Sequence, residues 1–285
     1  MQPYPKVQAP RSAFIFEMTV TVAVIVQARF GDLKKGRYPG KVLLPLPTGR
    51  TVLEEVLFRC QAIPGIDVVV AALPDTPDTL PLLPFVRRAQ DLRRNHDLID
   101  EYVRFMESRG ERDLPTDLAG APGAREWDYG RTPIELVHGP EDDVLTRYVI
   151  AADAVKADVI MRVTADCPLI SPDVCGTVID AFFENQPLDY ACNCLPQTWP
   201  HGYDCEVFSY DTLQRANHAP KRDAEGVDTW MQTSPGVRRL NIVNPDGDYH
   251  RIRLTLDTPA DYLAIHNEMV RRIWAWTGHE REMRV

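Results

Sequence analysis

Two aspartates stand where strands are expected to end, and together they could bind a metal ion. Asp166 follows the apolar run 159–163, which has the composition of a buried parallel strand. Asp257 follows the run 252–256, which is also expected to be a strand. Hard cations such as Mg²⁺ prefer oxygen ligands, and ligands of open α/β sheets bind beyond the carboxyl ends of the strands. The pair therefore fits a Mg²⁺ site, although each aspartate could instead cap the helix that follows it.

A basic segment that contains glycine, residues 27–41, follows the expected first strand at 20–26. Glycines let backbone N–H groups approach phosphate oxygens closely, and arginine and lysine side chains add mobile positive charge. The segment matches neither the Walker phosphate loop nor the dinucleotide-binding glycine pattern. It is expected to hold a polyphosphate, although a solvated basic loop would have the same composition. Its candidate residues are Arg29, Gly31, Arg37 and Lys41.

Two further acids, Asp204 and Glu206, are expected to alternate along one strand and so to point to the same side of it. There they could bind sugar hydroxyls or a second cation, or they could form an exposed polar face. Asp246 and Asp248 resemble the metal signature of nucleotide-sugar glycosyltransferases. They lie, however, in the segment 244–248, which has the composition of a turn and not of the end of a buried strand.

The elements that must position these residues alternate along the chain. Strands separated by helices of roughly 10 to 15 residues form βαβ units, so the pattern predicts an α/β fold with a mostly parallel central sheet. Residues 18–285 are expected to form a single domain with a helical and loop insertion at about 81–133. The other expected strands are 66–72, 134–137 and 190–193, and the expected helices are 51–62, 141–155, 172–184, 211–219 and 259–276.

The composition limits the class of protein. The formal net charge of the 285 residues is −9, and Lys and Arg are scattered among acids, so no nucleic-acid partner is expected, although a local field could still hold a nucleotide. No run approaches the ~18 apolar residues that span a bilayer, so no membrane partner is expected. Six cysteines without the spacing of a disulfide scaffold fit the reducing cytoplasm. Residues 1–17 are rich in proline and are expected to be a disordered leader.

Five sequence blocks occur in the order typical of one enzyme family. They read Q-A-R-F-G…R-Y-P-G-K, G-P-E-D-D-V-L-T-R-Y, R-V-T-A-D-C-P-L-I, G-Y-D-C-E-V-F-S and L-T-L-D-T-P-A-D, and they begin at positions 27, 139, 162, 202 and 254. These blocks resemble those of the cytidylyltransferases that activate acidic sugars. The resemblance is closest to the spore-coat-polysaccharide type, which is related to the acylneuraminate and 3-deoxy-manno-octulosonate enzymes.

The resemblance implies a Rossmann-like nucleotidyltransferase fold, the fold of the nucleotide-diphospho-sugar transferases. It implies transfer of CMP from CTP to an acidic small molecule in surface-polysaccharide biosynthesis, with release of pyrophosphate and with Mg²⁺ as cofactor. A homodimer is a further expectation. By resemblance, Asp166 and Asp257 are the metal ligands, and Arg29, Lys41 and Asp166 are catalytic. The implied nucleotide-binding residues are Ala28, Arg29, Gly31, Arg37, Lys41 and Thr164, and the expected acceptor-binding residues are Asp204, Glu206 and Arg222.

The chain departs from the family pattern at three places. Residues are added between Gly31 and Arg37, the family's Glu-His-Val-Thr block reads Glu-Gly-Val-Asp-Thr at 225–229, and residues 81–133 are longer than the family needs. The acceptor is therefore expected to be unusual: a phosphonate, a phosphorylated small molecule or a modified nonulosonic acid. A nucleotide-sugar glycosyltransferase of similar fold and a catalytically silent nucleotide-binding protein stay open as alternatives.

Overall fold

The structure is a computed structural model that describes residues 20–31, 39–91, 132–220 and 223–277. Arg37, Arg222, the expected leader and most of the expected insertion lie outside the described residues. Within those ranges, no helix combines the length and the apolar character that crossing a membrane requires.

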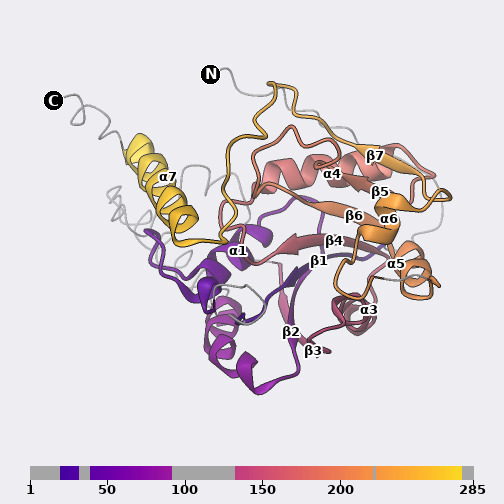
Figure 1. Cartoon of the computed structure of the whole chain (residues 1–285), viewed down its shortest axis with the longest axis horizontal. Coiled ribbons are helices and arrows are strands. Elements are labelled where there is room, and N and C mark those ends of the chain that lie inside the picture. The colour runs from indigo at the N-terminus through magenta and orange to yellow at the C-terminus, as the bar shows by residue number, and fades with distance from the viewer. Residues whose placement is uncertain (1–19, 32–38, 92–131, 221–222, 278–285) are drawn as a thin grey trace, which may run out of the picture.

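A seven-stranded sheet forms the centre of the described part of the chain, in the order β3-β2-β1-β4-β6-β5-β7 (Figure 1). Strand β6 runs antiparallel to β4 and β5, and the other neighbouring strands are parallel. The predicted α/β fold with a mostly parallel sheet is therefore confirmed. The strands are β1 (Val22–Gln27), β2 (Val68–Pro74), β3 (Ile134–Gly139), β4 (Val159–Thr164), β5 (Tyr190–Cys192), β6 (Glu206–Ser209) and β7 (Arg239–Asn241).

Helices cover both faces of the sheet because successive side chains of a strand point to opposite faces. In β1, Val24 and Val26 pack in one core cluster with α1 and α4, whereas Ala23 and Ile25 pack in another with α3 and α5. Figure 1 shows α3 and α5 together on one side of the sheet. The helices are α1 (Val52–Cys60), α3 (Val144–Val155), α4 (Pro172–Glu184), α5 (Tyr210–Asn217), α6 (Thr229–Thr233) and α7 (Pro259–Thr277), with the short 3-10 helices η2 (Lys41–Leu43) and η3 (Pro77–Leu82).

The helices that follow the two candidate metal ligands are capped by other residues. The side chain of Ser171 caps α4. At the start of α7, the hydroxyl of Thr258 accepts the N–H of Asp261 at 3.2 Å, and the carboxylate of Asp261 accepts the N–H of Thr258 at 2.8 Å. The capping alternative for Asp166 and Asp257 is therefore wrong.

The segment 252–256 is not a strand of the sheet. An isolated parallel bridge joins Arg253 to His201, and the N–H of Leu256 donates to the carbonyl of Asp166 at 2.8 Å. Because β4 is already flanked by β1 and β6, no free edge is left beside it. The strand predicted here was wrong, although the segment does end beside Asp166.

Candidate active site

A pocket of about 380 Å³ lies at the carboxyl ends of β1 and β4, the edge at which the sequence places the ligand cleft. Clefts of this size hold small molecules and cofactors. Seven of the predicted site residues line it, namely Ala28, Arg29, Gly31, Lys41, Thr164, Asp166 and Asp257.

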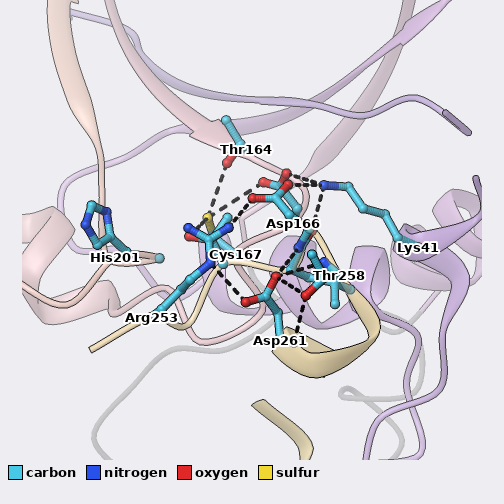
Figure 2. Close-up of polar contacts among 12 residues, drawn as sticks. Lys41, Thr164, Asp166, Cys167, His201, Arg253, Thr258 and Asp261 are labelled. Atoms are coloured by element: carbon cyan, nitrogen blue, oxygen red, sulfur yellow. Dashed lines mark hydrogen bonds and ion pairs between the residues drawn. The ribbon is translucent and has the colours of Figure 1, made fainter. Parts of the chain in front are cut away.

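The amino group of Lys41 joins the two candidate metal ligands. Its Nζ donates to Oδ2 of Asp166 at 2.8 Å, to Oδ1 of Asp257 at 2.9 Å and to the carbonyl of Leu256 at 2.6 Å. Figure 2 shows Lys41 extending toward Asp166. An ammonium group has three hydrogens, so all of them are engaged. Two carboxylates from distant segments of the chain therefore converge on one cation.

Burial and charge act in opposite directions on these groups. Burial would raise the pKa of Asp166, but the charge of Lys41 and the hydrogen bond from it outweigh that effect and lower the pKa. Burial would lower the pKa of Lys41, but Asp166 and Asp257 outweigh that effect and raise it. Asp166 and Lys41 are therefore both charged at neutral pH.

Arg253 and Asp261 hold Asp257 in place. Arg253 donates through Nη2 to the carboxylate of Asp257 and through Nε to Oδ1 of Asp261 at 2.9 Å. The backbone N–H of Asp257 donates to Oδ2 of Asp261 at 3.1 Å, and Figure 2 shows Arg253, Thr258 and Asp261 gathered at this point. Sequence reasoning missed Arg253. Its even spacing from Asp257, which puts both side chains on one side of an extended segment, could have indicated the contact.

The two carboxylates suit a divalent cation whose coordination is completed by a ligand and water. Mg²⁺ is usually bound by one or two protein carboxylates together with substrate phosphates. Asp166 and Asp257 supply such oxygens, and the position of Lys41 between them shows that positive charge is favoured there. Among the described residues, no three or more His, Cys, Asp or Glu side chains form a metal-binding group, so these residues alone do not enclose a metal.

The loop after β1 places its residues at the same pocket. Gly31 has φ of 98°, a left-handed conformation that glycine adopts without strain. Nη2 of Arg29 lies 4.0 Å from Oε2 of Glu225, and its Nη1 is buried without a hydrogen-bond partner. Ala28 is buried, and its N–H donates to the carbonyl of Ala72 at 3.3 Å. The pocket therefore contains positive charge that protein acceptors only partly satisfy.

Asp204 and Glu206 are not displayed side by side on a strand. Strand β6 begins at Glu206, so Asp204 precedes it and accepts hydrogen bonds from the Gln197 side chain at 2.5 Å and the Gly202 N–H at 3.2 Å. Glu206 is 3% exposed and accepts two hydrogen bonds from Nη1 of Arg162, at 3.0 and 2.9 Å. The alternative of an exposed polar face is therefore wrong for Glu206, while the role of both acids in acceptor binding stays a prediction.

Glu206 belongs to a buried charged cluster. Nη1 of Arg162 also lies 3.9 Å from Oδ2 of Asp228, so one guanidinium faces two carboxylates. Burial raises the pKa of Glu206, Arg162 lowers it and Asp228 raises it again, with a net increase to about 7. Glu206 therefore changes its charge close to neutral pH.

Arg147 is a pocket residue to which the sequence assigned no role. It lines the pocket and is 1% exposed. Its Nη1 donates to the carbonyl of Pro140 at 2.7 Å, whereas its buried Nε has no partner. Burial lowers the pKa of the Arg147 guanidinium. No local sequence signal indicates this burial, because arginine is seldom buried and its packing against Gly139 decides the position.

Comparison with known proteins identifies relatives of the chain, although no protein-family model matches it. The spore coat polysaccharide biosynthesis protein SpsF of Bacillus subtilis is 25% identical over 250 residues, which cover 86% of this chain and 84% of that protein. A cytidylyltransferase from Leptospira borgpetersenii superposes with a TM-score of 0.69 at 21% identity, over 88% of this chain and 87% of that chain. The chain is a relative of SpsF with a cytidylyltransferase fold. This confirms the resemblance found in the sequence blocks.

Two further proteins are similar to the chain. The uncharacterized protein MJ1063 of Methanocaldococcus jannaschii is 30% identical over 133 residues, 45% of this chain, and the match spans about half (53%) of that protein's length. A structure of CMP:2-keto-3-deoxy-manno-octonic acid synthetase complexed with CTP has a TM-score of 0.54 at 15% identity and covers 88% of this chain and 99% of that chain. The chain therefore shares its fold with that synthetase.

Proposed function

We propose that the chain is a Mg²⁺-dependent cytidylyltransferase that transfers CMP from CTP to an acidic sugar and releases pyrophosphate. The observation that carries this proposal is the convergence of Asp166 and Asp257 on Lys41, in a pocket beside the loop after β1. The relationship to SpsF, named for spore coat polysaccharide biosynthesis, supports a role in making a surface polysaccharide. The likeness to a CTP-bound synthetase supports CTP as the donor.

The reaction needs positioning and charge neutralisation more than covalent chemistry. An oxygen of the acceptor attacks the α-phosphorus in line, and pyrophosphate leaves. Asp166 and Asp257 would hold the metal ion, which supplies positive charge to the phosphate oxygens. Arg29 and Lys41 bring positive charge from the protein to the same pocket. The proposed nucleotide site is completed by Ala28, Gly31 and Thr164. It also includes Arg37, which lies outside the described residues.

The acceptor is proposed to be an acidic small molecule, with a nonulosonic or related acid first and a phosphonate or phosphorylated small molecule as the alternative. Its carboxylate needs a cation or backbone donors near the attacking oxygen. Asp204 stays a proposed acceptor ligand, although it does not line the pocket and accepts hydrogen bonds from Gln197 and Gly202. Arg222, outside the described residues, stays the proposed cation for the carboxylate.

The deciding experiment mixes the purified chain with Mg²⁺, CTP and a panel of sugar acids, phosphonates and phosphorylated small molecules. We expect pyrophosphate release with one acid and a new CMP conjugate in the mass spectrum. A conjugate with a hexose phosphate alone would refute the sugar-acid acceptor and favour the phosphorylated alternative. Transfer from a ready-made nucleotide sugar without pyrophosphate release would establish a glycosyltransferase, and CTP binding without turnover of any partner would establish a binding protein.

A further inference from the structure

Two cysteines with adjacent sulfur atoms lie at the end of β5. Cys192 is the last residue of this strand, and Cys194 follows after a bend at Asn193. The Asn193 side chain donates to the carbonyl of Tyr203 at 2.8 Å and accepts the N–H of Cys205 at 2.9 Å. It therefore points to one side of the chain, and its two neighbours point to the other. A hydrogen bond joins the two sulfur atoms, with Cys194 as the donor.

The neighbouring strands hold this pair of thiols in place. The sulfur of Cys192 lies 3.3 Å from Oδ1 of Asn241, which belongs to β7. The sulfur of Cys194 lies 3.9 Å from Oε1 of Glu206, which belongs to β6. The side chain of Asn241 also accepts the N–H of Leu195 at 2.7 Å, which fixes the chain just after the pair. Figure 1 shows β5 between β6 and β7, so both flanking strands position the thiols.

The two thiols differ in acidity. The hydrogen bond from Cys194 outweighs burial and, with further bonds from the N–H groups of Cys194 and Leu195, lowers the pKa of the Cys192 thiol to about 7. Donation of that bond, burial and the charge of Glu206 all raise the pKa of the Cys194 thiol. A thiolate is the nucleophilic form of cysteine, and a neighbouring thiol can then complete a disulfide. The pair therefore combines a nucleophile with a second thiol that still carries its proton.

The other four cysteines of the chain lie deeper in the protein. Cys60, Cys167, Cys175 and Cys205 are buried, and burial raises the pKa of the Cys60 and Cys167 thiols. Cys175 and Cys205 are also joined by a hydrogen bond between their sulfur atoms, but both are fully buried and the pKa of the Cys205 thiol is raised. Cys194 is only half-buried, so a small reagent can reach the pair at the end of β5 from solvent.

We propose that Cys192 and Cys194 are a redox-active pair, which a peroxide oxidises to a disulfide. The Cys192 thiolate attacks one peroxide oxygen, so that an S–O bond forms, the O–O bond breaks and hydroxide leaves with the proton that Cys192 had released. The Cys194 sulfur then attacks this sulfenic acid, so that an S–S bond forms, the S–O bond breaks and the second hydroxide takes the Cys194 proton. Two thiols and one hydrogen peroxide thus give one disulfide and two waters, and the peroxide accepts both electrons.

This modification site goes beyond the proposed function, because neither Cys192 nor Cys194 lines the pocket that contains Asp166 and Asp257. Its test therefore needs neither nucleotide nor metal.

The test treats the folded full chain with hydrogen peroxide, removes the peroxide, unfolds the protein and labels the remaining thiols with iodoacetamide. Chymotrypsin then releases residues 191–203 as one peptide, in which Cys192 and Cys194 are the only cysteines. We expect mass spectrometry to show that this peptide has lost two hydrogen atoms and carries no label. Treatment with a dithiol reductant before labelling should restore both labels, because a disulfide is reducible by thiols.

The same sample contains a matched control pair. Cys175 and Cys205 should keep their labels, because their sulfur atoms are in contact but are closed to solvent. The variant Cys194→Ser should form no disulfide, and its 191–203 peptide should gain oxygen on Cys192 instead of losing hydrogen.

Three results would overturn the proposal. They are full labelling of the wild-type 191–203 peptide after peroxide treatment, gain of oxygen in that peptide without loss of hydrogen, and equally fast oxidation of Cys175 and Cys205. Circular dichroism before and after treatment checks that the chain stays folded during oxidation. If Cys194→Ser does not fold, the wild-type peptide masses decide by themselves.

Discussion

At the scale of single residues, the contacts of Asp166 are directed at the pocket and not at the core. Its carboxylate contacts Lys41, and the core of the sheet beneath it is apolar. Asp166→Asn should therefore lower kcat/KM for CTP by at least about a hundredfold, because an amide is a poor metal ligand, while the circular dichroism spectrum stays unchanged. Asp246→Asn is the control, since this exposed residue lies in the turn that contains the rival glycosyltransferase motif. Loss of activity in Asp246→Asn with retention in Asp166→Asn would reverse the two assignments.

The raised pKa of Glu206 predicts a specific dependence of stability on pH. Its pKa is about 7 in the folded protein and about 4.3 in an unfolded chain, so between these values the folded state binds a proton that the unfolded state has lost. The free energy of unfolding should therefore fall as pH rises through this window. Glu206→Gln cannot titrate, so its stability relative to the wild type should rise between about pH 5 and about pH 7.5, as measured by urea unfolding. A difference that does not vary with pH would contradict the assigned pKa.

At the scale of elements, the segment 252–257 shows where sequence reasoning ends. Alternating apolar residues indicate an extended chain, and the chain here is extended enough to bridge to His201. Whether it joins a sheet depends on a free edge, and β6, which returns antiparallel beside β4, has taken that edge. The position of Asp257 was predictable from the order of the blocks, but its partners Arg253 and Asp261 depend on how the segment turns into α7.

Gly202 keeps this segment in place. It has φ of 101°, and a Cβ there would lie 2.7 Å from the backbone carbonyl of Leu254. Gly202→Ala should destabilise the protein by roughly 1–3 kcal/mol and should lower activity, because displacing Leu254 displaces Asp257. Urea unfolding and pyrophosphate release measure the two effects. Gly236→Ala is the control, since a Cβ there meets nothing within 4 Å; equal effects of the two substitutions would exclude the steric explanation.

At the scale of the whole molecule, the strongly buried half of the fold was the more predictable half. Strands β1, β2 and β4 are nearly continuous apolar runs, as parallel strands buried on both faces must be, and the sequence predicts each of them. By contrast, no residue of the three-residue strand β7 is buried and α6 contains only five residues, so neither has a clear apolar pattern, and neither was predicted. Arg147 escaped notice for a similar reason, because burial of one arginine is decided by packing against Gly139 and not by its local sequence.

The pocket gathers segments from most of the described chain, so ligand binding should stabilise the molecule as a whole. Residues 27–31 follow β1, Thr164 ends β4, and Asp257 and Thr258 precede α7. CTP with Mg²⁺ at about a hundred times its Kd should add roughly 2.7 kcal/mol to the free energy of unfolding, since the unfolded chain does not bind it. For a chain of this size, this corresponds to an increase in Tm of several degrees, measurable by differential scanning calorimetry.

The same binding should be visible by hydrogen exchange. Protection by CTP and Mg²⁺ is expected in peptides that cover 27–31, 164–166 and 256–258, because their backbone borders the pocket. Peptides that cover β5 and β7 should not change, because these strands form the far end of the sheet order and do not line the pocket. Protection confined to β5 and β7 would place the nucleotide elsewhere on the molecule. An increase in Tm with no protection at 256–258 would show that Asp257 does not take part in binding, and the metal site would then rest on Asp166 alone.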